Sequence, residues 1–176
     1  MDSAADPRDP QTNSIVIEMI TPVDYEAAND VVLKAYRQVL GKFLDPGYAS
    51  HLRDIKGRIT VANVYVARKK NTIVGCVTYV GDPTSPLAEG LLEGEVGIRM
   101  LGVDPSQQGL GIGRRLATHC VEMAGQDGAN AVFLYSTTMM KSAHRLYESL
   151  GFLRVPARDI LISPEMTLLA FRLAIV

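Results

Sequence analysis

The sequence predicts a mixed α/β fold of the α+β kind, in which one central sheet is flanked by helices. Residues 95–101 alternate between polar and apolar side chains, which is typical of a strand. Residues 112–124 repeat apolar side chains at helical spacing directly afterwards. Strand-like and helix-like segments also alternate along most of the chain, which favours a sheet with helices packed on it over an all-α or all-β architecture.

The chain has 176 residues, a length that suits one domain able to bury about 70% of its unfolded surface. Residues 1–13 are rich in Asp, Pro, Ser and Ala and show no periodicity, so we expect a disordered leader there. Residues 14–176 are then expected to form the single folded domain.

The first half of this domain is predicted to contain a strand over 14–20 and then a long helix. Thr21 and Pro22 favour a helix start, and Gly41 ends the helix after Leu40. A shorter helix is expected over 48–55. One side of the long helix is apolar and consists of Tyr25, Ala28, Val32, Ala35 and Val39.

Two strands are expected next, over 63–68 and 72–80, joined by a turn at Lys69 to Asn71. A Pro- and Gly-containing loop over 81–94 leads to the strand at 95–101. In that strand we expect Val96, Ile98 and Met100 on one face and Glu95, Gly97 and Arg99 on the other.

The second half is predicted to hold a buried strand over 131–135, whose end offers Ser136, Thr137 and Thr138 as helix caps. A helix with an apolar stripe follows and stops at Gly151, a loop covers 156–165, and a strand covers 166–175. The stripe consists of Ala143, Leu146, Tyr147 and Leu150. The predicted order is β-α-α-β-β-β-α-β-α-β, with no repeat.

The segment from Val103 to Leu116 places three glycines and two arginines between the strand and the long helix at 112–124. The helix is expected to begin near Gly109 to Gly111, where unpaired backbone N–H groups and the positive end of the helix dipole favour an anion. Glycine allows a phosphate to approach the backbone closely. The segment therefore predicts a phosphate-binding loop, although a glycine-rich turn that only caps a helix is an alternative.

The spacing of these glycines excludes two common nucleotide-binding loops. G-x-G-x-x-G fails because Arg114 or Leu116 occupies its last position, and the Walker pattern fails because no lysine follows the glycines. Gln108 to Gly113 reads Q-G-L-G-I-G. Together with Val103 and Pro105, it resembles the V-x-P-x-x-[RQ]-G-x-G-x-G loop of the GNAT N-acetyltransferase superfamily, which binds the acetyl-CoA pyrophosphate.

A second match lies downstream, where residues 143–152 read AHRLYESLGF. This is similar to the A-x-x-L-Y-x-x-L-G-F signature that follows the fifth strand in the same family. The resemblance covers about residues 15–175. It implies a mostly antiparallel sheet, splayed between its fourth and fifth strands, with acetyl-CoA as the co-substrate.

The resemblance also implies roles for individual residues. Tyr147 is expected to be the general acid for the departing CoA thiolate, while a tyrosine serving only the core is the alternative. A bulge in the fourth strand is expected near Gly102. The cofactor contacts implied are Leu101, Gly102, Val103, Gln108, Gly109, Leu110, Gly111, Ile112, Gly113, Arg114, Ser136, Ser142 and Tyr147.

The chain departs from the family pattern at two positions. Many members carry a glutamate where this chain has Gly97, so Glu95 is the candidate base, acting through water, or else a charge without a catalytic role. His144 is a second candidate base, but a solvated histidine is the more common case. Met140 stands where an asparagine often contacts the cofactor, and Ser142 is expected to take over part of that contact.

Composition agrees with one small cytoplasmic enzyme, and the resemblance implies that it transfers an acetyl group from acetyl-CoA to an amine. A net charge of −1 argues against a nucleic-acid or anionic-membrane partner. No apolar run reaches the length of a membrane span, and no signal peptide is visible. Cys76 and Cys120 lie in apolar contexts that favour buried thiols, and no metal site is predicted. The sequence leaves open a homodimer, and also a non-catalytic acyl-CoA-binding module of the same fold.

Overall fold

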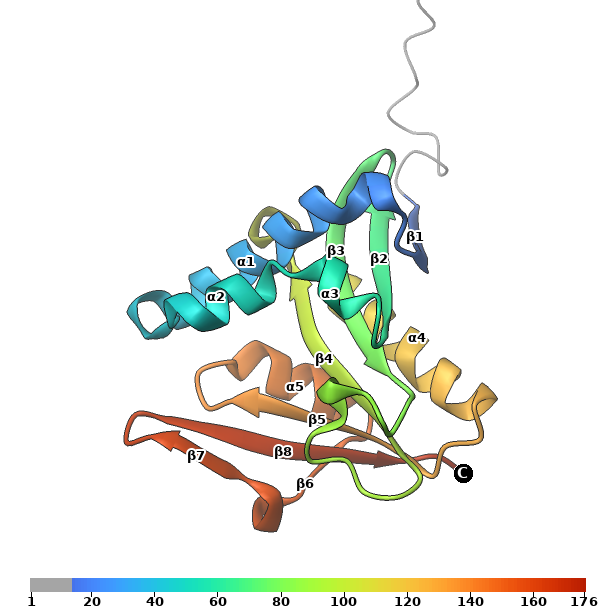
Figure 1. Cartoon of the computed structure of the whole chain (residues 1–176), viewed down its shortest axis with the longest axis vertical. Coiled ribbons are helices and arrows are strands. Elements are labelled where there is room, and N and C mark those ends of the chain that lie inside the picture. Colours follow the sequence, from blue (N-terminus) through green and yellow to red (C-terminus); the bar gives the residue numbers. More distant parts are fainter. Residues whose placement is uncertain (1–13) are drawn as a thin grey trace, which may run out of the picture.

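One eight-stranded sheet runs through the molecule and carries helices on both faces (Figure 1). The computed structural model describes residues 14–176, so the leader expected over 1–13 lies outside the described residues. The helices are α1 (Tyr25–Leu40), α2 (Pro46–Leu52), α3 (Ile55–Arg58), α4 (Ile112–Gln126) and α5 (Lys141–Ser149). The strands are β1 (Ile15–Met19), β2 (Asn63–Lys69), β3 (Thr72–Val80), β4 (Glu95–Val103), β5 (Ala131–Thr137), β6 (Leu153–Arg154), β7 (Ile160–Ser163) and β8 (Met166–Ala174).

The strands lie in the order β1-β2-β3-β4-β5-β8-β6, and β7 pairs with β8. All neighbours are antiparallel except β4 and β5, which are parallel. This confirms the mixed sheet that the sequence predicts.

Two hydrophobic clusters lie on opposite faces of the sheet. On one face α4 buries Ile112, Leu116 and Cys120 against the strands. On the other face α1 buries Ala28, Val32 and their neighbours, and α2 and α3 extend this cluster. Each of these helices packs an apolar stripe against the sheet, and the burial of that apolar surface stabilises the packing.

The parallel ladder between β4 and β5 is short. It pairs Glu95 with Ala131, Val96 with Val132 and Gly97 with Phe133, and it ends there. Beyond Gly97 the strands diverge, so that β4 runs toward α1 while β5 runs toward the hairpin of β7 and β8 (Figure 1). The sheet is therefore open between its fourth and fifth strands.

A β-bulge interrupts β4 just past this fork. Thr78 pairs with Arg99 and Cys76 pairs with Gly102, so Met100 and Leu101 together oppose one residue of β3. Met100 has a φ of +50°, in the left-handed region. The bulge expected near Gly102 is thus present and centred on Met100.

Because of the bulge, the Met100 side chain lies on the opposite face of the sheet from the one that the sequence predicts. Val96 and Ile98 belong to the α4 cluster, whereas Met100 belongs to the α1 cluster. An extra residue in a strand reverses the alternation of side chains beyond it, and the sequence pattern alone does not show where this occurs.

Four other expectations need correction. Residues 156–165 include the strand β7 instead of forming only a loop. The expected helix at 48–55 is two short helices, α2 and α3. Val39 is 37% exposed, although it was expected on the apolar side of α1. The cap of α5 is Met140, with no side-chain hydrogen bond, so Ser136 to Thr138 do not cap it.

Cys76 and Cys120 are buried free thiols, as expected. Burial raises the pKa of each to about 12. Among residues 14–176, no helix is both long and apolar enough to cross a membrane.

Candidate active site

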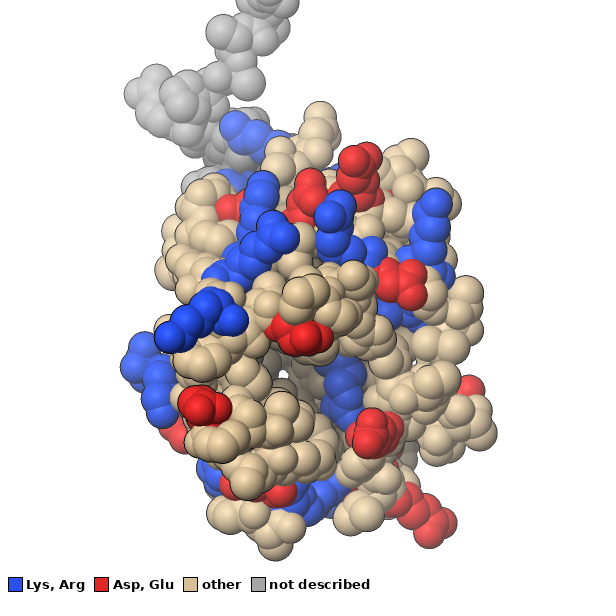
Figure 2. Space-filling model, turned by 60° about the vertical axis from the view of Figure 1, so that its left-hand side comes forward, with Lys and Arg blue, Asp and Glu red and all other residues tan. Residues whose placement is uncertain are grey.

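A cleft of about 750 Å³ lies where β4 and β5 diverge, bounded by α1, the loop before α4, and α5. Figure 2 looks toward the open side of the molecule, where the surface is hollowed and basic side chains lie at the inner wall. The lining residues are Ala35, Tyr36, Gln38, Val39, Leu101, Gly102, Val103, Gln107, Gln108, Gly109, Gly111, Ile112, Gly113, Arg114, Met139, Met140, Lys141, Ser142, Ala143 and Leu146.

The glycine-rich loop forms one end of this cleft. Gly109 and Gly111 have φ values of +80° and +77°, and a Cβ at either position would meet no atom within 4 Å. Gly111 is the N-cap of α4, whose first turn leaves backbone N–H groups without helical partners. The loop is therefore an open cradle of backbone donors that fits a pyrophosphate.

The charges lining the cleft suit an anion. Arg114 and Lys141 contribute positive charge, and none of the described lining residues is acidic. Arg114 donates a hydrogen bond of 2.5 Å to the Ser149 hydroxyl on α5. Gln108 donates to the Gln38 side chain on α1 at 3.0 Å, so the loop is tied to both walls.

Most of the cofactor contacts implied by the resemblance line this cleft, namely Leu101, Gly102, Val103, Gln108, Gly109, Gly111, Ile112, Gly113, Arg114 and Ser142. Leu110, Ser136 and Tyr147 do not. Leu110 points outward and is 55% exposed. Ser136 is buried at the end of β5, and its hydroxyl has no hydrogen-bond partner within residues 14–176.

Gly102 and Gly113 serve packing as well as access. A Cβ on Gly102 would lie 3.1 Å from the Cα of Val32 in α1. A Cβ on Gly113 would lie 3.3 Å from Leu146 of α5. These glycines let helices approach the floor and one end of the cleft.

Tyr147 lies on α5 and is 6% exposed. Its ring packs against Phe152 and Phe171, with centroid distances of 5.6 and 5.9 Å. Within the described chain no residue hydrogen-bonds to its hydroxyl. Burial raises the pKa of Tyr147, so the hydroxyl is protonated at neutral pH.

Glu95 is placed differently from the candidate base that the sequence suggested. It is buried at the start of β4 and accepts hydrogen bonds from Arg158 and from Arg172, at distances of 2.8–2.9 Å. Burial raises its pKa, but the bonds from Arg158, the Leu92 N–H and Arg172 outweigh this and leave the pKa at about 2. A carboxylate this weakly basic, outside the cleft lining, is a structural anchor between β4 and the C-terminal strands.

His144 also differs from the expectation that it is solvated. It is 9% exposed, its Nε2 donates to the Thr137 carbonyl at 2.9 Å, and its ring packs against Phe171. Burial lowers its pKa. Its fixed hydrogen bond joins α5 to β5 and gives it a structural role.

Sequence reasoning missed the contribution of α1, which supplies Ala35, Tyr36, Gln38 and Val39. No local motif marks these residues, because only the packing of α1 across the fork brings them to the cleft. Lys141 was also missed, although a cation next to the expected α5 start was visible in the sequence.

Arg99 sits at the fork itself. Its guanidinium donates to the carbonyls of Ile98 and Phe133, at 3.0 and 3.5 Å, and so bridges β4 to β5 where their ladder ends. It also donates to the Glu89 carbonyl, at 3.0 Å. A Cβ on Gly97 would lie only 3.1 Å from this guanidinium. Arg99 thus occupies the space beside the position where many GNAT members carry a glutamate.

Comparisons with known proteins agree with this geometry. Residues 31–152 match the model of the "Acetyltransferase (GNAT) family". The chain is 30% identical over 134 residues to N-acetylaspartate synthetase from Danio rerio, covering 74% of this chain and 45% of that protein. It is 34% identical over 109 residues to mycothiol acetyltransferase from Thermobispora bispora, covering 58% and 36%.

The chain thus spans less than half the length of these curated relatives. Among solved structures, the fold resembles the PaiA N-acetyltransferase from Thermoplasma acidophilum in complex with coenzyme A. The TM-score is 0.68 at 14% identity, covering 89% of this chain and 98% of the other.

Proposed function

This chain belongs to the GNAT acetyltransferase family, and on that premise we propose that it moves an acetyl group from acetyl-CoA to a primary amine of a small molecule or peptide. The amine attacks directly while both substrates are bound. The observation that carries the proposal is the open glycine cradle at the start of α4, which joins a cleft at the fork of the sheet.

Binding of acetyl-CoA is assigned to the loop and to both walls. The backbone of Gln108 to Gly113 receives the pyrophosphate, and Arg114 and Lys141 add positive charge. Leu101, Gly102 and Val103 follow the bulge, where β4 has left β5 and its inner edge is available to hydrogen-bond the pantetheine amides. The unpartnered hydroxyl of Ser136 offers a further donor at the end of β5.

The bound thioester supplies an electrophilic carbonyl, and the chain orients the groups around it. The amine nitrogen forms the new C–N bond, the C–S bond breaks, and the amine loses a proton to water. Tyr147, kept protonated by burial, donates the proton that the CoA thiolate takes up, and it regains a proton from the water that accepted the proton of the amine. Glu95 has no part in this chemistry, because its carboxylate is bound by two arginines.

The names of the curated relatives support acetyl transfer, but they point to different products. One group is named for N-acetylaspartate and another for mycothiol. The acceptor of this chain therefore needs evidence of its own. The cytoplasmic location and the homodimer considered from the sequence stay predictions.

The proposal is tested by thiol release from acetyl-CoA in the presence of a panel of amino acids, polyamines, amino sugars and peptides. We expect turnover above background hydrolysis with at least one class, and a mass increase of one acetyl group on that amine. Tight CoA binding without turnover on any class would instead establish a non-catalytic acyl-CoA-binding module.

A further inference from the structure

Arg114 lines the phosphate end of the cleft, and two further arginines of interest, Arg58 and Arg99, lie outside the cleft lining and form no ion pair among the described residues. Arg68, Arg154, Arg158 and Arg172 each pair with Asp or Glu, but within residues 14–176 neither Arg99 nor Arg58 does. A guanidinium group without an ion pair can still form charge-assisted hydrogen bonds with an anionic group of a ligand.

Arg58 is 2% exposed, and its Nε and one terminal nitrogen have no hydrogen-bond partner in the described chain. Its other terminal nitrogen donates to the carbonyls of His51 and Leu52 and contacts the sulfur of Met100 at the bulge. Arg58 therefore holds a fixed positive charge directly beneath β4.

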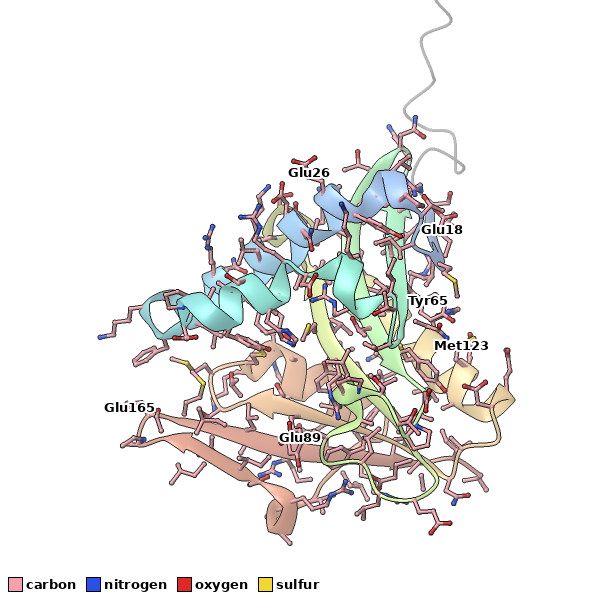
Figure 3. The ribbon with its side chains drawn as sticks, viewed as in Figure 1. Glu18, Glu26, Tyr65, Glu89, Met123 and Glu165 are labelled. Carbon is pink, nitrogen blue, oxygen red and sulfur yellow. The ribbon has the colours of Figure 1, made fainter. Side chains whose placement is uncertain are left out.

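Arg99 is more accessible and lies at the fork. All three of its hydrogen-bond acceptors are neutral backbone carbonyls, and its guanidinium forms no ion pair with an acidic side chain among residues 14–176. Glu89 lies on the loop before β4 (Figure 3), where Arg99 donates to its backbone oxygen and forms no ion pair with its side chain among residues 14–176.

The charges of both arginines act on a pair of tyrosines beside the cleft. Tyr36 and Tyr48 lie 6.0 Å apart between their ring centroids, and Tyr36 lines the cleft. Burial raises the pKa of Tyr48, while the charges of Arg58 and Arg99 both act to lower it. The two guanidinium groups thus contribute positive charge near Tyr48, whose ring packs against Tyr36 at the wall of the cleft.

We propose that the acceptor is an amine carrying a carboxylate group, such as an amino acid, and that the Arg99 guanidinium binds that carboxylate. This inference rests on the proposed function and names its substrate class. The amine then lies at the fork, where no acidic side chain of the described cleft lining competes for it. Arg58 adds positive charge but does not contact the carboxylate, because its nitrogens without hydrogen-bond partners are buried.

The test compares amino acids with their carboxamides, which match in shape and lack the charge. The panel is the set of common α-amino acids together with β-alanine, each with its amide. For the preferred acceptor we expect the acid to exceed the amide in kcat/KM by about 10- to 100-fold, the range of a charge-assisted hydrogen bond. The amide has the more easily deprotonated amine, so intrinsic reactivity would favour the opposite order.

Three variants assign this preference to Arg99. Arg99→Gln should reduce the acid-to-amide ratio to near one and leave the KM for acetyl-CoA unchanged, while Arg99→Lys should retain part of the ratio. Gly97→Ala adds a Cβ that displaces the guanidinium without changing any charge, and should also lower the ratio. Arg37→Gln removes an exposed arginine of α1 outside the cleft lining and should not alter it.

A binding measurement separates this inference from the proposed function. Saturation-transfer NMR in the presence of CoA compares N-acetyl amino acids with their amides on the wild type and on Arg99→Gln, and needs no turnover. Equal binding or equal turnover of acids and amides, or an equal loss of both in Arg99→Gln, overturns the inference. Preferential binding of acids without turnover on any amine supports it and contradicts only the proposed transferase activity.

Discussion

Tyr147 holds a hydroxyl at the end of a ring that Phe152 and Phe171 pack on two sides. Tyr147→Phe keeps that packing and removes only the hydroxyl. If the hydroxyl protonates the thiolate, kcat at saturating acetyl-CoA should fall by about 10- to 1000-fold, with the melting temperature and CoA affinity preserved.

Tyr65→Phe is the matched control. Tyr65 is a buried tyrosine on β2 that packs against His119 of α4 (Figure 3). Loss of its hydroxyl should leave kcat unchanged. An unchanged kcat in Tyr147→Phe, with a lower melting temperature, would assign that tyrosine to the core alone.

Glu95 links pH to stability. Its pKa of about 2 lies below the ordinary glutamate value, so its two ion pairs stabilise the fold above about pH 4.3 by about 3 kcal/mol. This contribution is lost as the pH falls from there through about 2. Glu95→Gln should therefore lower the free energy of unfolding by about 2 to 4 kcal/mol at pH 7, measured by urea denaturation.

The difference between Glu95→Gln and the wild type should shrink toward zero between pH 4.3 and pH 2. Glu93→Gln removes an exposed carboxylate two residues away and should cost far less at every pH. A difference that does not change with pH would show that the ion pairs are not the source of the loss.

Residues within a contiguous motif could be predicted from the sequence, and residues placed by the tertiary fold could not. Gly109, Gly111 and Arg114 line the cleft because the loop that they build is local. The partners of Glu95, Arg158 and Arg172, are 63 and 77 residues away, so no local pattern indicates that they bind its carboxylate.

At the scale of elements, the loop before α4 works because two of its residues take left-handed backbone angles. Gly111→Val should weaken CoA binding by at least about 100-fold, since its branched side chain would stand where a phosphate meets the helix. Isothermal titration calorimetry with CoA measures the loss directly.

The matched control is Gly128→Val, at the other end of α4. Gly128 has a φ of +70° and open space around its Cβ position, so it carries a similar backbone strain without lining the cleft. Both variants should lose a similar amount of stability, and only Gly111→Val should lose affinity. Equal CoA affinities would refute the phosphate role of the loop.

The order of helices and strands was largely predictable, because amphipathic periodicity and the glycines that end helices are features of short stretches of sequence. The bulge in β4 and the strand β7 were not. Met100 takes a positive φ at the bulge, a backbone angle that residues other than glycine seldom adopt. β7 exists because β8 offers it a pairing edge.

At the scale of the whole molecule, β1–β4 with α1 and α4 form one half of the sheet, and β5–β8 form the other. Their shared ladder has three residue pairs. A ligand that contacts α1, the loop and α5 together should bind the folded state alone and stabilise both halves. At 100 times its dissociation constant, CoA should raise the melting temperature by about 5 to 10 °C.

Differential scanning fluorimetry checks this shift, with Gly111→Val as the non-binding control. Pantetheine, which lacks the nucleotide phosphates, should give a smaller shift than CoA at equal concentration. Equal shifts would mean that the phosphates contribute nothing to affinity.

The diverging strands also bear on self-association. Past Gly97 and Phe133, β4 and β5 each carry an inner edge that no strand of the described chain covers, and open edges invite foreign strands. An intruding strand would need a parallel-sided gap of about 10 Å, twice the spacing between neighbours in a sheet, held along several residues. The gap between the diverging strands β4 and β5 widens steadily, so it has that width at one point only. The angle that makes room for a substrate therefore also keeps a second molecule from adding a strand there, and Arg99 closes the narrow end of the fork by bridging the two strands.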